Sequence, residues 1–320
     1  MAVLIEASDL KKRFGEILAV DGISLEVQRG EVLGFLGPNG AGKSTTMKML
    51  TGFLEPDAGS ARIAGIDVLG SPKLAKRQLG YLPEGAPCYG DMTAHAFLTF
   101  IAEIRGFVRE EAKRRIAQAV DKTQLFSVLE QKIDTLSKGF KRRVAIAQAI
   151  LHDPQVLIMD EPTDGLDPNQ KHQVRRLIAD MAADKAIIVS THILEEVEAV
   201  CSRAVIINRG RIVADGTAED LMRRLPYHNT IAMQVPAGRA EAVAKALSEF
   251  AAIAKVETVG TANGRVRLRA SPHAGAPIPS ELASLIRARL IEAEEVHVER
   301  GNLDEVFRQI TTSDAGTSHA

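Results

Sequence analysis

The sequence predicts an α/β fold built on a largely parallel sheet, followed by a smaller α+β domain. First, short and almost wholly apolar runs such as EVLGFLG (31–37) and VLIM (156–159) are typical of strands buried on both faces. Second, such runs alternate with helical patterns after residue 155, which indicates crossover helices. Third, the pattern restarts near Pro226 in the order β-α-β-β-α-β, that of a ferredoxin-like unit.

Composition narrows the class of protein. Hydrophobic residues make up 45% and charged residues 25% of the 320 positions, so a packed core is expected. A net charge of −1 argues against a protein that coats nucleic acid by charge alone. Cys88 and Cys201 fit no metal spacing and suggest a reducing cytoplasm. No apolar run approaches the ~18–20 residues of a membrane span, so any spanning falls to another chain.

The elements of the first half follow in order. We expect a strand end and a turn over EASDLKKRFGE (6–16), and a second strand that ends in a turn at Arg29 and Gly30. The buried strand at 31–37 leads into a helix over about 42–50. Residues 93–131 show the 3.6-residue period of helices, which predicts a helical subdomain at about 88–152.

The second half predicts the domain limits. Strand and helix alternate through QVLIMDE, NQKHQVRRLIADMAAD, AIIVSTH, ILEEVEAVC and AVIINRG, which completes a first domain at 1–227. The second domain, 228–312, contains a turn at Asn263 and Gly264, a helix over ELASLIRARL (281–290), and a closing helix. Asn302 and Glu305 have capping-box spacing at the start of that helix. We expect the tail 313–320 to be disordered.

The stretch GPNGAGKST (37–45) matches the phosphate-binding loop, with a predicted strand before it and a predicted helix after it. Glycines let backbone N–H groups point at phosphate oxygens, and the helix N-terminus adds a partial positive charge. We expect Lys43 to reach the β- and γ-phosphates and Ser44 to ligate magnesium. The nucleotide site comprises Gly37, Pro38, Asn39, Gly40, Ala41, Gly42, Lys43, Ser44 and Thr45.

Two apolar strands end in side chains that can bind metal or transfer protons. Asp160 and Glu161 end the run VLIMDE, and alone they fit equally well two solvent-facing acids. Beside a phosphate loop, however, Asp160 can hold magnesium and Glu161 can orient or deprotonate the attacking water. His192 ends IIVSTH at the expected ligand-binding edge of the same sheet, which predicts a contact with the γ-phosphate.

A basic helix is predicted from TLSKGFKRRVAIAQAI (135–150). Ser137 is placed to cap it, and Gly139 lies in its first turn, where glycine weakens a helix. Lys141, Arg142 and Arg143 are most simply a solvated face, with a minor share in attracting nucleotide.

In order, the chain carries GPNGAGKST, GYLPE, LSKGF, VLIMDEP, DGLDP and STH. Over roughly residues 3–225 it resembles the nucleotide-binding subunit of an ATP-binding cassette (ABC) transporter. The resemblance implies the P-loop NTPase fold of an ABC cassette, with a mixed sheet core and a helical subdomain. It also implies an ATPase that binds ATP and Mg²⁺, works in head-to-tail pairs, and energises a separate polytopic permease. In LSKGF, which departs from the common LSGGQ, Ser137 and Gly139 would touch the γ-phosphate of the opposite subunit. Asp167 resembles the loop that couples the two sites.

Two further positions follow from the resemblance. Glu84 stands where the family usually has a magnesium-contacting glutamine that senses the permease, although a plain surface acid is the other interpretation. Phe14 stands where an aromatic ring stacks on adenine, and a core phenylalanine is its alternative.

The C-terminal part is similar to an accessory domain of an exporter-like branch of the family, which includes drug-export, gliding-motility and copper-maturation subunits. The resemblance therefore implies an exporter subunit, cytoplasmic and peripheral on the inner face of the membrane, with no nucleic acid expected. One alternative is a soluble ABC ATPase acting on nucleic acid or ribosomes, and a weaker one is a small-molecule kinase. One phosphate loop, no heptad run and no paired cysteines argue against the former, while LSKGF and STH have no role in the latter.

Overall fold

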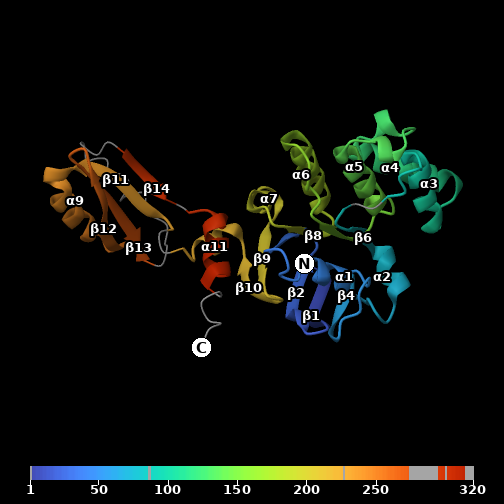
Figure 1. Ribbon diagram of the computed structural model, residues 1–320, viewed down its shortest axis with the longest axis horizontal. Coiled ribbons are helices and arrows are strands. Elements are labelled where there is room, and N and C mark those ends of the chain that lie inside the picture. The colour runs from blue at the N-terminus through green and yellow to red at the C-terminus, as the bar shows by residue number, and fades with distance from the viewer. Residues whose placement is uncertain (1, 86–87, 226–227, 274–294, 300, 314–320) are drawn as a thin grey trace. The chain divides into compact units, whose positions relative to one another are not determined.

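The structure is a computed structural model that describes residues 2–85, 88–225, 228–273, 295–299 and 301–313 (Figure 1). It divides into two compact units, Met1–Asp215 and Gly216–Ala320. The helix expected at 281–290 lies outside the described residues, as does the predicted tail from residue 314 onward. The domain limits 1–227 and 228–312 stay predictions.

A six-stranded sheet forms the centre of the first unit, in the order β10-β9-β3-β8-β7-β6. β3 pairs in parallel with β8 and β9, and β7 pairs in parallel with β6 and β8. Every residue of β3, β7 and β8 is buried, as their apolar sequences predict. The strands are β3 (Val32–Leu36), β6 (Leu79–Leu82), β7 (Val156–Asp160), β8 (Ala186–Thr191), β9 (Arg203–Asn208) and β10 (Arg211–Gly216).

A second sheet is antiparallel in its described pairs and has the order β2-β1-β4-β5. Its strands are β1 (Val3–Phe14), β2 (Ile17–Gln28), β4 (Ala58–Ile63) and β5 (Ile66–Asp67). The turn predicted within 6–16 is wrong for most of that range, because β1 runs on to Phe14 and only Gly15 and Glu16 turn. Register shifts, one of them beside Asp9 at φ 49°, let the polar strand continue against β2.

The helices of the first unit include those predicted at 42–50, 93–131 and 137–150. α3, α4 and α5 share one core cluster with β7, in which Leu98, Val120, Val144 and Leu157 are almost fully buried. This cluster attaches the helical subdomain to the sheet (Figure 1). The helices are α1 (Lys43–Leu50), α2 (Pro72–Gln78), α3 (Ala94–Ile104), α4 (Arg109–Thr123), α5 (Lys138–Ile150), α6 (Pro168–Ala182) and α7 (Leu194–Val200), with 3-10 turns η1 (Phe126–Val128) and η2 (Ile133–Thr135).

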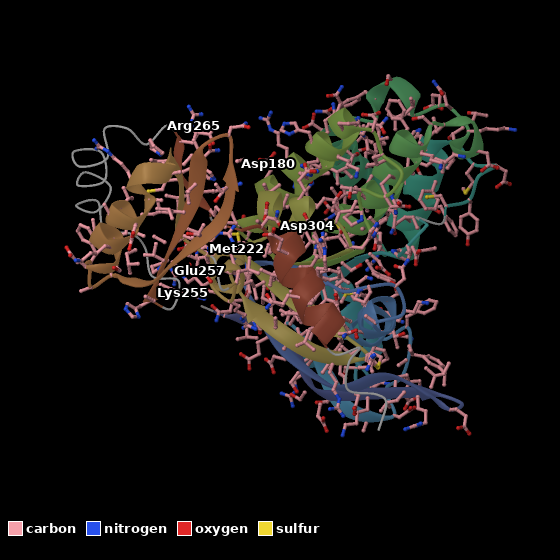
Figure 2. All side chains as sticks on the ribbon, turned by 60° about the vertical axis from the view of Figure 1, so that its left-hand side comes forward. Asp180, Met222, Lys255, Glu257, Arg265 and Asp304 are labelled. Atoms are coloured by element: carbon pink, nitrogen blue, oxygen red, sulfur yellow. The ribbon has the colours of Figure 1, made fainter. Side chains whose placement is uncertain are left out.

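The second unit contains an antiparallel sheet in the order β12-β13-β11-β14. β13 lies between β11 and β12, which α9 connects, so the unit has the split β-α-β arrangement predicted from the sequence. Lys255 and Glu257 on β12 form a 2.5 Å ion pair (Figure 2). The elements are α8 (Ala218–Met222), β11 (Thr230–Pro236), η3 (Ala237–Arg239), α9 (Ala240–Ser248), β12 (Ile253–Ala262), β13 (Arg265–Pro272), β14 (Glu295–Glu299) and α11 (Leu303–Ser313).

Local signals in the second unit are confirmed. Asn263 and Gly264 form the turn between β12 and β13 with φ of 49° and 73°, values that favour Asn-Gly. At the start of α11 the backbone N–H of Glu305 donates to Asn302 Oδ1 at 2.9 Å, and that of Asn302 donates to Glu305 Oε2 at 3.3 Å. Among the described residues of the whole chain, no helix is long and apolar enough to cross a membrane.

Candidate functional site

The loop 37–45 connects the end of β3 to α1, as predicted. Gly42 has φ 105°, and a Cβ there would lie 2.5 Å from the carbonyl oxygen of Ala19. A Cβ on Gly37 would lie 2.6 Å from the carbonyl oxygen of Ile207. Both positions therefore require glycine, because backbone packs directly against them. The loop holds its backbone in a shape that suits the approach of an anion to N–H groups.

Lys43 begins α1 and is only 8% exposed. Its Nζ donates to the carbonyl oxygens of Gly37, at 2.7 Å, and of Pro38, at 3.2 Å, so the side chain lies over its own loop. Burial lowers the pKa of Lys43, and the negative charges of Glu161, Asp160 and Glu84 oppose that shift. The structure thus brings the loop lysine and the three predicted carboxylates into one electrostatic neighbourhood.

Asp160 ends β7 and is 1% exposed. It accepts a hydrogen bond from the hydroxyl of Ser190, which lies opposite it on β8. A buried carboxylate needs such a hydrogen-bond partner. The role of Ser190, which comes directly before Thr191 and His192, was not predicted from the sequence. Its signal was the polar end of an otherwise apolar strand.

Glu161 follows with φ 50°, an uncommon conformation for a residue with a side chain. The Glu161 side chain is 14% exposed and faces His192, whose side chain is 51% exposed. His192 Nδ1 lies 3.0 Å from Oε1 and 2.9 Å from Oε2 of Glu161. The two residues predicted to act on the γ-phosphate and its attacking water therefore contact each other directly.

The two positions assigned through the resemblance lie in different surroundings. Glu84 is exposed just after β6. Partial burial raises the pKa of half-buried Tyr81 to about 12, and the negative charges of Asp160 and then Glu84 add to that shift. Phe14 is 48% exposed at the end of β1, with Lys12 Nζ 5.9 Å from its ring centroid. The alternative of a core phenylalanine is therefore wrong, and the ring is accessible for stacking.

The predicted signature residues lie beside α6. Ser137 caps α5, and its Oγ accepts from the backbone N–H of Phe140 at 3.4 Å. A Cβ on Gly139 would lie 2.4 Å from the end of the Gln170 side chain, so a larger residue there would displace Gln170. Asp167 caps α6 by accepting from the backbone N–H of Gln170 at 2.9 Å. In the described chain, none of the hydrogen bonds or ion pairs of Ser137, Gly139 and Asp167 involves the loop 37–45.

The interpretation of Lys141, Arg142 and Arg143 as one solvated face is wrong for Arg142, which is 6% exposed. Gly139, Arg142 and Ile146 are all buried on α5 at helical spacing. That periodicity was a sequence signal, but a cation on an apolar face is normally assigned to solvent.

A phosphate-type loop, an acid pair and a histidine at the ends of neighbouring strands define a P-loop NTPase of the cassette type. The ABC transporter family matches residues 20–164. The Linearmycin resistance ATP-binding protein LnrL of Bacillus subtilis (strain 168) is 34% identical over 309 residues, 96% of this chain and 98% of that protein. The Nod factor export ATP-binding protein I of Burkholderia pseudomallei (strain 1710b) is 39% identical over 68% of this chain and 72% of its own length.

Solved structures of ABC transporter ATP-binding subunits have the same fold over about two thirds of this chain. An ATP-binding subunit of an ABC transporter is 34% identical, with a TM-score of 0.64 over 69% of this chain and 92% of that chain. A dimeric ABC transporter cassette, 23% identical with a TM-score of 0.62 over 67% of this chain and 98% of its own, shares the fold. The chain belongs to the ATP-binding subunits of ABC transporters, which are ATPases.

Proposed function

We propose that this chain hydrolyses ATP to energise a separate transmembrane exporter. One observation carries the proposal: the parallel order β3-β8-β7-β6 lines up four strand ends at one sheet edge. They lead, in that order, to the loop 37–45, His192, the Asp160–Glu161 pair and Glu84. This edge is where open α/β sheets bind ligands.

The residues at this edge fit ATP and Mg²⁺. Backbone N–H groups of the loop, the partial positive charge of the α1 N-terminus, and Lys43 suit phosphate oxygens. Mg²⁺ prefers oxygen ligands, which the Ser44 hydroxyl and the carboxylates of Asp160 and Glu84 supply. The metal neutralises phosphate charge when bound. Glu161 orients and deprotonates the water, and His192 turns from Glu161 to the γ-phosphate.

The signature residues act on a second subunit in this proposal. Ser137 and Asp167 are exposed at the starts of α5 and α6, and among the described residues neither they nor buried Gly139 form a hydrogen bond with the loop 37–45 of their own chain. A head-to-tail pair places them against the γ-phosphate of the partner's ATP. The pairing converts phosphate contacts into a conformational stroke.

The permease binds beside α3 in this proposal. A groove of about 620 Å³ includes Tyr81 on β6, Ile104 on α3, and Phe53 beyond α1, of which Phe53 is 76% and Ile104 65% exposed. Exposed apolar side chains around a groove mark an interaction surface. The names of the relatives, which refer to drug resistance and export, support an exporter. Binding there makes the chain a peripheral protein on the cytoplasmic face.

The test is ATP hydrolysis by the purified chain with a polytopic membrane protein, taken from the neighbouring reading frame where one is encoded there, in vesicles. We expect Mg²⁺-dependent phosphate release that Lys43→Ala abolishes, together with co-purification of the two proteins. Release of equal phosphate by Lys43→Ala, or transfer of phosphate to a metabolite, would contradict the proposal. Binding to ribosomes or DNA with no membrane partner would favour the soluble alternative.

A further inference from the structure

Two loops that carry predicted trans-acting residues contact each other within one subunit. The signature segment begins α5, and residues 164–167 precede α6. The Lys138 side chain lies over Gly165, with Cδ 3.6 Å and Nζ 3.9 Å from the position of a Cβ on that glycine. Gln170 fills the space beside Gly139. The two segments are therefore packed together, with Lys138 against Gly165 and Gln170 against Gly139.

Arg142 is the buried member of this contact. It is 6% exposed, and its Nη2 donates to the carbonyl oxygen of Asp164 at a long 3.5 Å. Its Nη1 is buried with no hydrogen-bond partner in the described chain. A buried guanidinium with an unmade hydrogen bond is costly, so its retention needs another source of stabilisation.

Negative charge surrounds Arg142. Burial lowers the pKa of Arg142, and four carboxylates oppose the shift, Asp164 most strongly, followed by Glu161, Asp160 and Glu84. Asp164 is exposed, and among the described residues its carboxylate forms no ion pair with any cation, Arg142 included. The contact between the two residues is the hydrogen bond from Arg142 Nη2 to the Asp164 backbone carbonyl, so Arg142 holds the loop that carries this charge.

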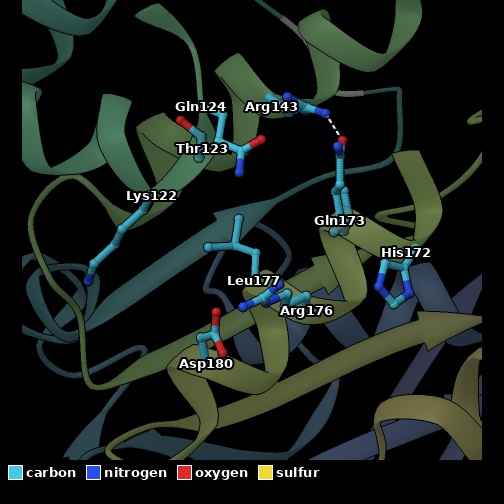
Figure 3. A pocket seen from close by; sticks show the side chains of 10 residues that line it. Lys122, Thr123, Gln124, Arg143, His172, Gln173, Arg176, Leu177 and Asp180 are labelled. Atoms are coloured by element: carbon cyan, nitrogen blue, oxygen red, sulfur yellow. Dashed lines mark hydrogen bonds between the residues drawn. The ribbon is translucent and has the colours of Figure 1, made fainter. Parts of the chain in front are cut away.

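Arg143, the next residue, provides the contrast. It donates to Gln173 Oε1 on α6 (Figure 3). Its guanidinium carbon also lies 5.4 Å from the centroid of the Phe140 ring. Burial lowers its pKa, and the opposing charge is that of Asp167 rather than those of the site acids. Adjacent arginines of equal charge therefore face different surroundings, and of the two only Arg142 is buried.

We propose that Arg142 is a positioning residue for ATP hydrolysis, which locks the signature loop to the 164–167 loop of its own subunit through Asp164. The two loops then present exposed Ser137 and Asp167 to the partner's ATP as one rigid surface, with buried Gly139 packed between α5 and Gln170. Because the second subunit receives that surface, loss of Arg142 acts mainly on the partner's site. This inference rests on the proposed function.

The first test needs neither nucleotide nor metal. Urea unfolding is measured for the wild type, Arg142→Gln, Asp164→Asn and the double variant. We expect the unfolding equilibrium constants to deviate from additivity at least threefold, since groups in contact couple and distant groups do not. Additivity within twofold would overturn the Arg142–Asp164 pairing. Should Arg142→Gln not fold, Arg142→Met with Asp164→Asn gives the same cycle, because methionine also removes the charge and fills similar space.

The second test separates a trans effect from simple misfolding. Arg142→Gln alone is expected to lower kcat at least tenfold, and Arg142→Lys to lower it less. Mixing Arg142→Gln with Lys43→Ala leaves one composite site with an intact loop 37–45 and an intact signature surface. We expect the mixture to exceed the mean activity of the two separate variants at least threefold, whereas a purely local defect gives no gain.

Each outcome has one meaning. Arg114→Gln, a change to a cation that is 59% exposed on α4 and paired with Glu111, should leave kcat within twofold of wild type, and a tenfold loss there would assign the effect to any cation of the helical subdomain. Wild type that hydrolyses ATP, combined with a mixture that shows no gain, overturns the role of Arg142 alone. A wild type with no hydrolysis in the presence of its membrane partner overturns the proposed function itself.

Discussion

At the scale of single residues, Asp160 and Glu161 are chain neighbours with different environments. Asp160 is 1% exposed and held by Ser190, whereas Glu161 has φ 50° and reaches His192. An isolated pair of surface acids would show neither feature. The difference suits two roles, a fixed metal ligand and a base that can exchange partners.

Replacing Glu161 with Gln should remove the base and keep the shape of the side chain. We expect kcat to fall by about 10²–10⁴-fold, the usual contribution of a general base, with ATP binding retained. The protein should then accumulate as an ATP-bound dimer, visible by size-exclusion chromatography. Glu195→Gln, a change to a carboxylate that is 77% exposed, is the control. Near-normal turnover of Glu161→Gln would remove this residue from its role.

His152 gives a pH prediction away from the site. Burial, aided by the charge of Arg105, lowers the pKa of His152 to about 4, while Nε2 lies 3.0 Å from the carbonyl oxygen of Leu79. The unfolded chain binds a proton near the ordinary pKa of about 6.5, so stability is present above that pH and is lost toward pH 4. Lowering the pH from 7.5 to 5.5 should therefore reduce the free energy of unfolding by roughly 1 kcal/mol through this residue.

The measurement is the free energy of unfolding in urea at both pH values. In His152→Gln the loss between pH 7.5 and 5.5 should shrink by that amount, since glutamine does not titrate. His172→Gln, at an exposed position on α6, should keep the wild-type dependence. Equal pH dependence in wild type and His152→Gln would show that His152 is not buried in its neutral form.

At the scale of elements, the sequence could predict what local patterns determine. Apolar runs located β3, β7 and β8, and spacing located the phosphate loop and the caps at Ser137 and Asn302. β4, β5 and α2 were not predicted, because they are short and carry weak periodicity. The burial of Arg142 was missed for another reason, since its environment is made by Asp164 and β7, distant in sequence.

Ser137 tests whether α5 begins at a functional surface or only at a cap. Ser137→Arg should lower kcat at least tenfold, because a bulky cation would enter the contact with the partner's nucleotide. Loss of the cap alone costs about 1 kcal/mol of stability. Thr93→Ala removes the comparable cap of α3, where Thr93 Oγ1 accepts from the Ala96 N–H at 3.1 Å, and should leave kcat unchanged. Equal kcat in Ser137→Arg and wild type would count against head-to-tail pairing.

At the scale of the whole molecule, the order of the strands assembles the site. Parallel pairing of β3 with β8, β8 with β7, and β7 with β6 brings together segments that are far apart along the chain. Local sequence could predict each strand end but not this order, because long-range pairing depends on how crossover helices cover the sheet. Likewise, the pairing of Glu161 with His192 emerges only once β7 and β8 are neighbours.

The groove beside α3 allows the two proposed activities, permease binding and ATP binding, to be tested separately. Phe53 and Ile104 line this groove with exposed side chains, and neither belongs to the phosphate-binding loop 37–45. Phe53→Ser with Ile104→Ser should weaken binding to the permease at least tenfold, since burying each such side chain contributes about 1.5–3 kcal/mol. ATP binding by the isolated chain should stay unchanged. Flotation with permease-containing vesicles measures permease binding, and nucleotide titration measures ATP binding.

Phe126→Ser, a change to a ring that is 64% exposed on η1, is the control. If the double variant still floated like wild type while the Phe126 variant did not, the docking surface would lie on η1 instead.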